Sequence, residues 1–154
     1  MPVYVLDSSV VAKLFLLEDD SHQAKAVLQH AIDGHITLLC PMLMLYEVVN
    51  AFIIQNLDVE AIKTHIDELE GLIDNEIITI VPASQQLLAK ATEIAATDTQ
   101  GLGYISSYDA AFHALALTAS GTLLTADVKH AQKTKTLFGS VEILADFSVK
   151  PAED

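Results

Sequence analysis

The stretch Val3-Tyr4-Val5-Leu6-Asp7-Ser8-Ser9 determines how the rest of the sequence is interpreted. Its first half is an apolar run with β-branched residues, which predicts a short buried strand. Asp7-Ser8-Ser9 ends that run with residues that favour turns and the first positions of helices. Apolar residues then recur at helical spacing over 10–17, so a helix is expected directly after the strand. A strand that leads into a helix is typical of a parallel sheet.

The same alternation continues to the other end of the chain. We predict further strands at 36–40, 77–81, 122–126 and 141–144, and helices at 21–32, 42–55, 59–73, 84–96, 108–119 and 127–134. The residues expected to start helices are Ser21, Asp58, Ser84 and Ser106 or Ser107. This order predicts an α/β fold, a three-layer α/β/α arrangement around a central, mostly parallel sheet. Residues 1–148 are expected to form a single domain, and 149–154 a frayed C-terminal tail.

Composition bounds the class of protein. With 154 residues, of which 51% are hydrophobic, the chain has enough apolar material for one core and is not a disordered segment. The N-terminus lacks the basic segment of a signal peptide. The longest nearly uncharged apolar stretch, Ile36–Tyr46, contains Pro41 and is shorter than the ~20 residues of a membrane span. The single cysteine, Cys40, excludes a disulfide within the chain and fits a reducing compartment. We therefore expect a soluble, cytoplasmic protein with no membrane partner.

The charge of the chain argues against a nucleic-acid partner. Its 8 basic residues are all lysines, and 21 acidic residues bring the formal net charge to −13. Affinity for a phosphate backbone is largely electrostatic, so a surface of this kind repels nucleic acid by default.

Two aspartates follow predicted strands directly. Asp7 comes after the first strand and Asp127 after the strand at 122–126. Ligands of parallel α/β sheets bind beyond the carboxyl ends of the strands, which is where both side chains are expected. The alternative is that each aspartate only caps the helix that follows it.

Two more acids lie on predicted helices. Glu47 belongs to the helix at 42–55, whose residues are apolar almost all round, so we expect that helix to be buried. A buried carboxylate is costly unless it is paired or bound to a metal, and Asn50 shares its face; the alternative is a glutamate that reaches solvent. Asp109 falls in the first turn of the helix at 108–119, where it complements the helix dipole. His113 lies one turn further on and is interpreted as a core or supporting residue.

Together these four acids would lie near one another without matching basic residues. Clustered carboxylates raise one another's pKa, and a divalent cation with oxygen ligands relieves the repulsion. Mg²⁺ or Mn²⁺ suits such ligands and stabilises the oxygens of a phosphoryl displacement. Ser8, Ser9 and Thr125 would add hydroxyl groups at the same edge of the sheet.

The sequence resembles the PIN domain family, metal-dependent nucleases that include the VapC toxins of toxin–antitoxin pairs. Four segments carry the resemblance in family order and at similar spacing, and together they extend it over about residues 2–147: VLDSSVVAK at 5–13, YEVVNA at 46–51, SYDAAFHALA at 107–116 and LTAD at 124–127.

The resemblance implies a ribonuclease that uses Mg²⁺ or Mn²⁺. In such an enzyme, metal-activated water attacks an RNA phosphodiester in line and leaves a 5′-phosphate and a 3′-hydroxyl. The catalytic acids would be Asp7, Glu47, Asp109 and Asp127. The three aspartates would ligate the metal, directly or through water, and the glutamate would help orient the attacking water. Supporting polar groups would be Ser8, Ser9, Asn50 and Thr125. The resemblance also implies a homodimer and, for a toxin, a small antitoxin partner.

The sequence departs from the family in its basic residues. Members usually carry lysines or arginines around the site to hold RNA, and here the candidates are Lys13, Lys129, Lys133 and Lys135. The last three equally fit a solvated helix face. Two alternatives therefore stay open. One is a catalytically weak binding module whose acidic surface docks a basic protein. The other is a phosphatase with Asp7 as nucleophile, although the second acid expected in such enzymes is replaced by Ser9.

Overall fold

Strand β1 (Val3–Leu6) occupies the middle of a five-stranded sheet in the computed structural model, which describes residues 1–148. The other strands are β2 (Thr37–Pro41), β3 (Ile78–Val81), β4 (Thr122–Thr125) and β5 (Val141–Ile143). Their order is β3-β2-β1-β4-β5, and every neighbouring pair is parallel. The predicted tail at 149–154 lies outside the described residues.

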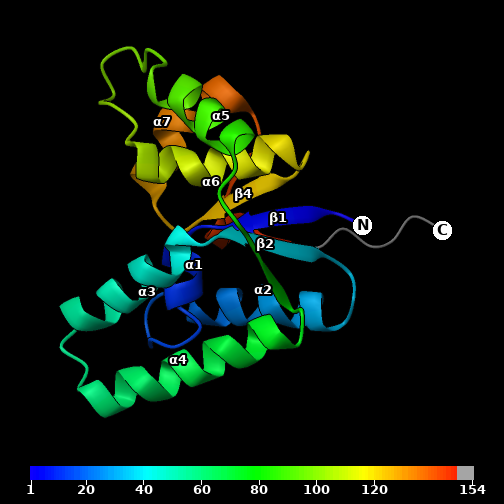
Figure 1. The fold of residues 1–154 in the computed structure, drawn as a ribbon, viewed down its shortest axis with the longest axis vertical. Coiled ribbons are helices and arrows are strands. Elements are labelled where there is room, and N and C mark those ends of the chain that lie inside the picture. The colour runs from blue at the N-terminus through cyan, green and yellow to red at the C-terminus, as the bar shows by residue number, and fades with distance from the viewer. Residues whose placement is uncertain (149–154) are drawn as a thin grey trace.

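Helices cover both faces of this sheet (Figure 1). On one side lie α1 (Ser8–Ala12), α2 (Ser21–Ile32), α3 (Leu43–Ile54) and α4 (Val59–Asp74); on the other lie α5 (Gln85–Ala95), α6 (Ser107–Thr118) and α7 (Val128–Phe138). A short 3₁₀ turn follows at Leu144–Asp146. The strands are buried between the two layers; Val5, Leu38 and Ile78 are almost fully excluded from solvent. The predicted three-layer α/β/α fold is confirmed, with a sheet that is entirely parallel over the described residues.

The topology creates one place where the chain changes direction across the sheet. From β1 the chain builds outward through β2 and β3, and it then returns to add β4 and β5 on the other side of β1. The two halves diverge between the carboxyl ends of β1 and β4, and such a switch point is where open α/β sheets bind ligands. Register places Leu6 opposite Leu124, so Asp7 and Thr125 follow side by side.

Most predicted helix starts agree with the structure, but the start of α2 does not. The side chains of Asp58, Ser84 and Ser106 each accept a backbone N–H from the first turn of their helix. Ser21 is instead the first residue of α2, after Asp20 in a left-handed conformation (φ 65°). Its hydroxyl accepts the Glu18 N–H and donates to the Leu16 carbonyl, so it stabilises the preceding turn. The prediction of Ser21 as N-cap is wrong because its hydroxyl is engaged upstream.

Three other helices differ from expectation. Helix α1 ends at Ala12, short of the predicted helix over 10–17, because residues 13–15 form tighter turns in which each backbone N–H donates to the carbonyl three residues before it. Helix α3 is not buried all round: Tyr46, Ile53 and Ile54 are 77%, 57% and 67% exposed. Only the side that carries Met44, Val48 and Phe52 enters the core. Helix α7 continues to Phe138, one turn beyond the predicted end, because Gly139 (φ 67°) supplies its left-handed terminus. None of the helices among residues 1–148 is long and apolar enough to cross a membrane.

Candidate active site

Asp7 lies at the switch point, and two hydroxyl groups hold its carboxylate. The residue occupies the N-cap position of α1, yet its side chain caps nothing. Its Oδ2 accepts hydrogen bonds from Ser9 Oγ at 2.8 Å and from Thr125 Oγ1 at 2.7 Å. Its backbone N–H donates to the Leu124 carbonyl at 3.0 Å, which fixes the residue against β4. The capping alternative therefore does not describe Asp7.

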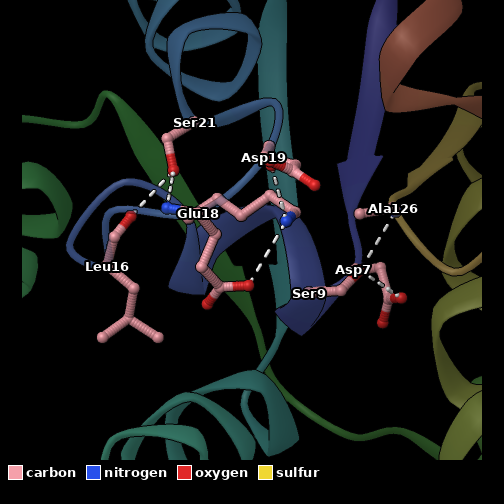
Figure 2. Close-up of polar contacts among 8 residues, drawn as sticks. Asp7, Ser9, Leu16, Glu18, Asp19, Ser21 and Ala126 are labelled. Carbon is pink, nitrogen blue, oxygen red and sulfur yellow. Dashed lines mark hydrogen bonds and ion pairs between the residues drawn. The ribbon is translucent and has the colours of Figure 1, made fainter. Parts of the chain in front are cut away.

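The two hydroxyls also bind the turn after β4. Ser9 Oγ accepts the Ala126 N–H at 3.1 Å, and Thr125 Oγ1 accepts the Asp127 N–H at 3.0 Å. Figure 2 shows Ser9 and Asp7 side by side, with Ala126 next to them. Because a hydroxyl has a single hydrogen, each backbone donor leaves that hydrogen free to be donated to Asp7. The arrangement orients Asp7 Oδ2 and leaves Oδ1 without a hydrogen-bond donor among the described residues.

Glu47 approaches from α3. Its side chain is half-buried, and its Oε1 accepts a hydrogen bond from Ser8 Oγ at 2.7 Å. Consecutive serines at the start of α1 thus hold two different acids, Ser8 the glutamate and Ser9 the aspartate. Asn50, one turn further along α3, is exposed and makes no side-chain hydrogen bond within residues 1–148. No side-chain contact within residues 1–148 supports the role predicted for Asn50.

Charge is uncompensated at this site. Burial raises the pKa of Asp7, and the negative charge of Asp109 raises it further, against the lowering effect of the two hydroxyls and His130. Burial likewise raises the pKa of Glu47, to which the charges of Asp7 and Asp109 also contribute. Within residues 1–148, the ion pairs involve other residues, so these acids form no ion pair.

Asp109 is placed by the start of α6. Ser106 caps that helix by accepting the Asp109 N–H at 3.1 Å, which leaves the carboxylate in the exposed first turn. It lies close enough to act electrostatically on both Asp7 and Glu47. Three of the four predicted acids are therefore brought together by β1, α3 and α6.

Asp127 is engaged differently. Its side chain is exposed, and its Oδ1 accepts the His130 N–H at 3.1 Å, so it caps α7. The capping alternative describes this contact. Its backbone N–H still connects it to Thr125 and, through that hydroxyl, to Asp7. A role for Asp127 as a metal ligand remains a prediction.

A buried pair of histidines joins α6 to α7. His113 Nε2 and His130 Nε2 lie 3.0 Å apart, and both rings are buried. Burial, together with His130, lowers the pKa of His113 to about 3. The interpretation of His113 as a core residue agrees with this environment, whereas His130 was not singled out from the sequence. The only signal was its spacing, one turn after Asp127, as His113 follows Asp109.

The predicted RNA-binding lysines have structural partners. Lys13 Nζ donates to the Asp19 carbonyl at 2.8 Å and lies 3.4 Å from Glu18 Oε2. Lys133 Nζ donates to the Tyr104 carbonyl at 3.0 Å and so fixes the loop before α6. Lys129 is exposed in the first turn of α7. A role for any of them in RNA binding remains a prediction.

The donor set fits a divalent cation by its charge, and the geometry limits how the cation can be held. In the part of the chain that is described, no three His, Cys, Asp or Glu side chains converge closely enough to hold a metal by themselves. Mg²⁺ usually keeps several waters and is bound through one or two carboxylates. Partly buried acids without a basic partner therefore fit a largely hydrated ion.

Comparison with known proteins identifies the family. In fold, the chain is similar to FitAcB from Neisseria gonorrhoeae (TM-score 0.71, 16% identity, covering 94% of this chain and 99% of that one). It is also similar to VapBC-1 from nontypeable Haemophilus influenzae (TM-score 0.65, 15% identity, covering 94% of this chain and 99% of that one). A third similar structure is that of Mycobacterium tuberculosis VapC20, described as a sarcin-ricin loop cleaving toxin (TM-score 0.62, 14% identity, covering 88% of this chain and 95% of that one). No curated protein matches the sequence. The PIN domain family model matches residues 4–135, and the chain therefore belongs to the PIN domain family.

Proposed function

We propose that this protein is an endoribonuclease that depends on Mg²⁺ or Mn²⁺. The observation that carries the proposal is the carboxylate of Asp7, which is oriented by two hydroxyls at the switch point and faces further acids with no basic partner. Such an arrangement is unfavourable in the absence of a cation, because burial and mutual repulsion both act against the charged forms. Membership of the PIN domain family supports a nuclease reaction.

The proposed role of each residue follows from the contacts of its side chain. Asp7 would help hold the cation, and Ser9 and Thr125 fix the orientation of its carboxylate through Oδ2. Glu47, whose Oε1 accepts a hydrogen bond from Ser8, would orient the attacking water. A bound divalent cation would supply stabilisation of the attacking and leaving oxygens of the phosphodiester. Asp109 and Asp127 would add negative charge that favours retention of the ion.

Single-stranded RNA is the proposed substrate. With a net charge of −13 and no arginine, the chain is expected to bind RNA weakly, through the cation and a few lysines. Similarity to a structure described as a sarcin-ricin loop cleaving toxin supports a cleavage reaction.

A binding module without turnover is the second candidate. The excess of 21 acidic over 8 basic residues favours it, because a surface of this charge suits a basic protein partner better than RNA. This candidate predicts cation binding by the acids but no cleavage of any RNA.

Metal removal tests the proposal directly. We expect the protein to cleave a labelled pool of single-stranded RNA in Mn²⁺, to lose all cleavage in EDTA, and to recover it when Mn²⁺ is restored. The products should carry 5′-phosphate and 3′-hydroxyl ends, which are distinguished by gel mobility after phosphatase treatment. Cleavage that persists in EDTA would contradict the proposal. Calorimetric Mn²⁺ binding without cleavage would favour the binding module.

A small, basic antitoxin is the proposed protein partner, and a cytoplasmic location is proposed with it. Two solved structures with a similar fold are those of VapBC2 from Rickettsia felis and VapBC from Salmonella typhimurium, both bound to DNA. The acidic charge of this chain suits a partner of opposite charge, since complementary potentials favour association.

A homodimer is also proposed, through an apolar hollow of about 360 Å³ lined by α5, α6, the ends of β2 and β3, and the start of α3. Exposed apolar side chains surround it, among them Met42, Leu88 and Tyr108. We expect the wild-type protein to have twice the chain mass in light scattering and Leu88→Glu to be monomeric. Leu88 is 62% exposed, so a charge at this position should leave the fold of one chain intact and be costly only where a second chain buries it. The control is Leu102→Glu, similarly exposed on the loop before α6. A monomeric wild type, or a dimeric Leu88→Glu, would reject this interface.

A further inference from the structure

A pocket of about 330 Å³ opens beside the candidate active site. Its lining includes Ser9 and Asp127, which belong to the hydrogen-bonded arrangement around Asp7. It also includes the last residue of α3, Ile54, and Gln55, which follows it. A ligand in this pocket would therefore lie next to a substrate that is bound at the acids.

The walls of the pocket are mainly apolar. They are formed by Ala12, Leu16, Ala51 and Ile54, together with the stem of Lys13, whose side chain is only 14% exposed. Figure 2 shows the turn that carries Leu16, Glu18 and Ser21 in the same region. The hydroxyl of Ser21 accepts the Glu18 N–H and donates to the Leu16 carbonyl, so this wall is held in place.

The polar groups of the pocket do not favour an anion. Glu18 and Asp127 are negative, and the one cation, Lys13, already contacts Glu18 and the Asp19 carbonyl. A phosphate group would therefore meet net repulsion. The side-chain amide of Gln55 has no hydrogen-bond partner among residues 1–148, and amides of this kind recognise the edges of bases.

We propose that this pocket binds one nucleobase of single-stranded RNA next to the phosphodiester at the acids, a subsite that rests on the proposed function. A neutral, planar ring suits the apolar walls, and unpaired RNA bases can turn out to enter such pockets. The cavity volume falls within the ~300–1,000 Å³ of small-molecule sites. Base contacts would supply the affinity that the phosphates of RNA cannot find on an arginine-free surface.

The test compares RNA with and without bases. Labelled homo-oligomers of A, C, G or U and an abasic ribose oligomer of equal length are titrated with protein at low salt, in EDTA and in Ca²⁺, which also takes oxygen ligands, and binding is followed by fluorescence anisotropy. We expect at least one base to improve binding about 10-fold over the abasic oligomer. Ile54→Trp, which fills the pocket from an exposed position, should reduce this preference to about twofold or less.

Ile53→Trp is the matched control. Ile53 is the preceding residue of α3, is similarly exposed and does not line the pocket, so this variant should keep the wild-type preference. Equal binding of abasic and base-containing RNA by the wild type would overturn the proposal. So would an unchanged preference in Ile54→Trp, which would leave a protein segment as the alternative occupant. Because the readout needs no cleavage, its failure is distinct from failure of the proposed ribonuclease activity.

Discussion

Asp7→Asn should lose at least about 100-fold in Mn²⁺-dependent RNA cleavage. The substitution keeps the shape of the side chain and an oxygen that can accept the hydrogen bonds of Ser9 and Thr125. It removes the negative charge that would hold the cation, so the loss should appear in kcat and in Mn²⁺ affinity measured by calorimetry. The measurement is the initial rate of cleavage of labelled single-stranded RNA over a range of Mn²⁺ concentrations.

The control for this prediction is Asp67→Asn, on the exposed face of α4 and without a side-chain contact among residues 1–148. It changes the net charge by the same amount and should cleave as the wild type does. Equal cleavage by wild type and Asp7→Asn would mean that a contaminating nuclease accounts for the activity, and the assignment of the site would fall.

The same substitution should stabilise the metal-free protein at neutral pH. Burial raises the pKa of Asp7 in the folded state above that of the unfolded chain, so folding binds protons and stability is lost as pH rises through the raised value. Below the ordinary carboxyl range, near pH ~4, this penalty is absent. We expect the melting temperature of metal-free Asp7→Asn to exceed that of the wild type by about 2–4 °C at pH 7, a difference that disappears on acidification.

Thermal melts in EDTA, followed by circular dichroism at pH 4, 5, 6 and 7, measure this difference. Taking the difference between the two melting temperatures at each pH removes the contribution of the other titrating groups, which the two proteins share. Mn²⁺ should raise the melting temperature of the wild type at pH 7 and leave that of Asp7→Asn unchanged, because ligand binding stabilises only a state that binds it. A lower melting temperature for Asp7→Asn in EDTA would show that the carboxylate stabilises the metal-free fold, contrary to its raised pKa.

The fold was predictable because its signals are local. The apolar run before Asp7 and the polar residues after it define β1 and α1, and Ser84 and Asp58 start their helices through their own side chains. Parallel pairing follows from the alternation of strands and helices. Even the carboxyl-end position of Asp7 can be derived, since the residue after a strand must lie at the edge of the sheet.

The contacts within the site were less predictable because they join distant residues. Nothing in the sequence near Glu47 indicates that Ser8 would bind it across 39 positions. The exposed side of α3 was missed because Tyr46, Ile53 and Ile54 are apolar, and periodicity cannot separate a buried apolar face from one left open. The pocket beside the candidate active site was also not predicted, because its walls come from three segments that are far apart in the sequence.

The histidine contact between α6 and α7 has a spectroscopic consequence. At 3.0 Å the two Nε2 atoms of His113 and His130 require one hydrogen between them, with one ring as donor and the other as acceptor. Because both rings are buried, that hydrogen is shielded from exchange with solvent. The protein therefore carries a native NMR reporter in a single imidazole N–H resonance, one helical turn from both Asp109 and Asp127, that senses whether the two helices stay joined when a cation or RNA arrives.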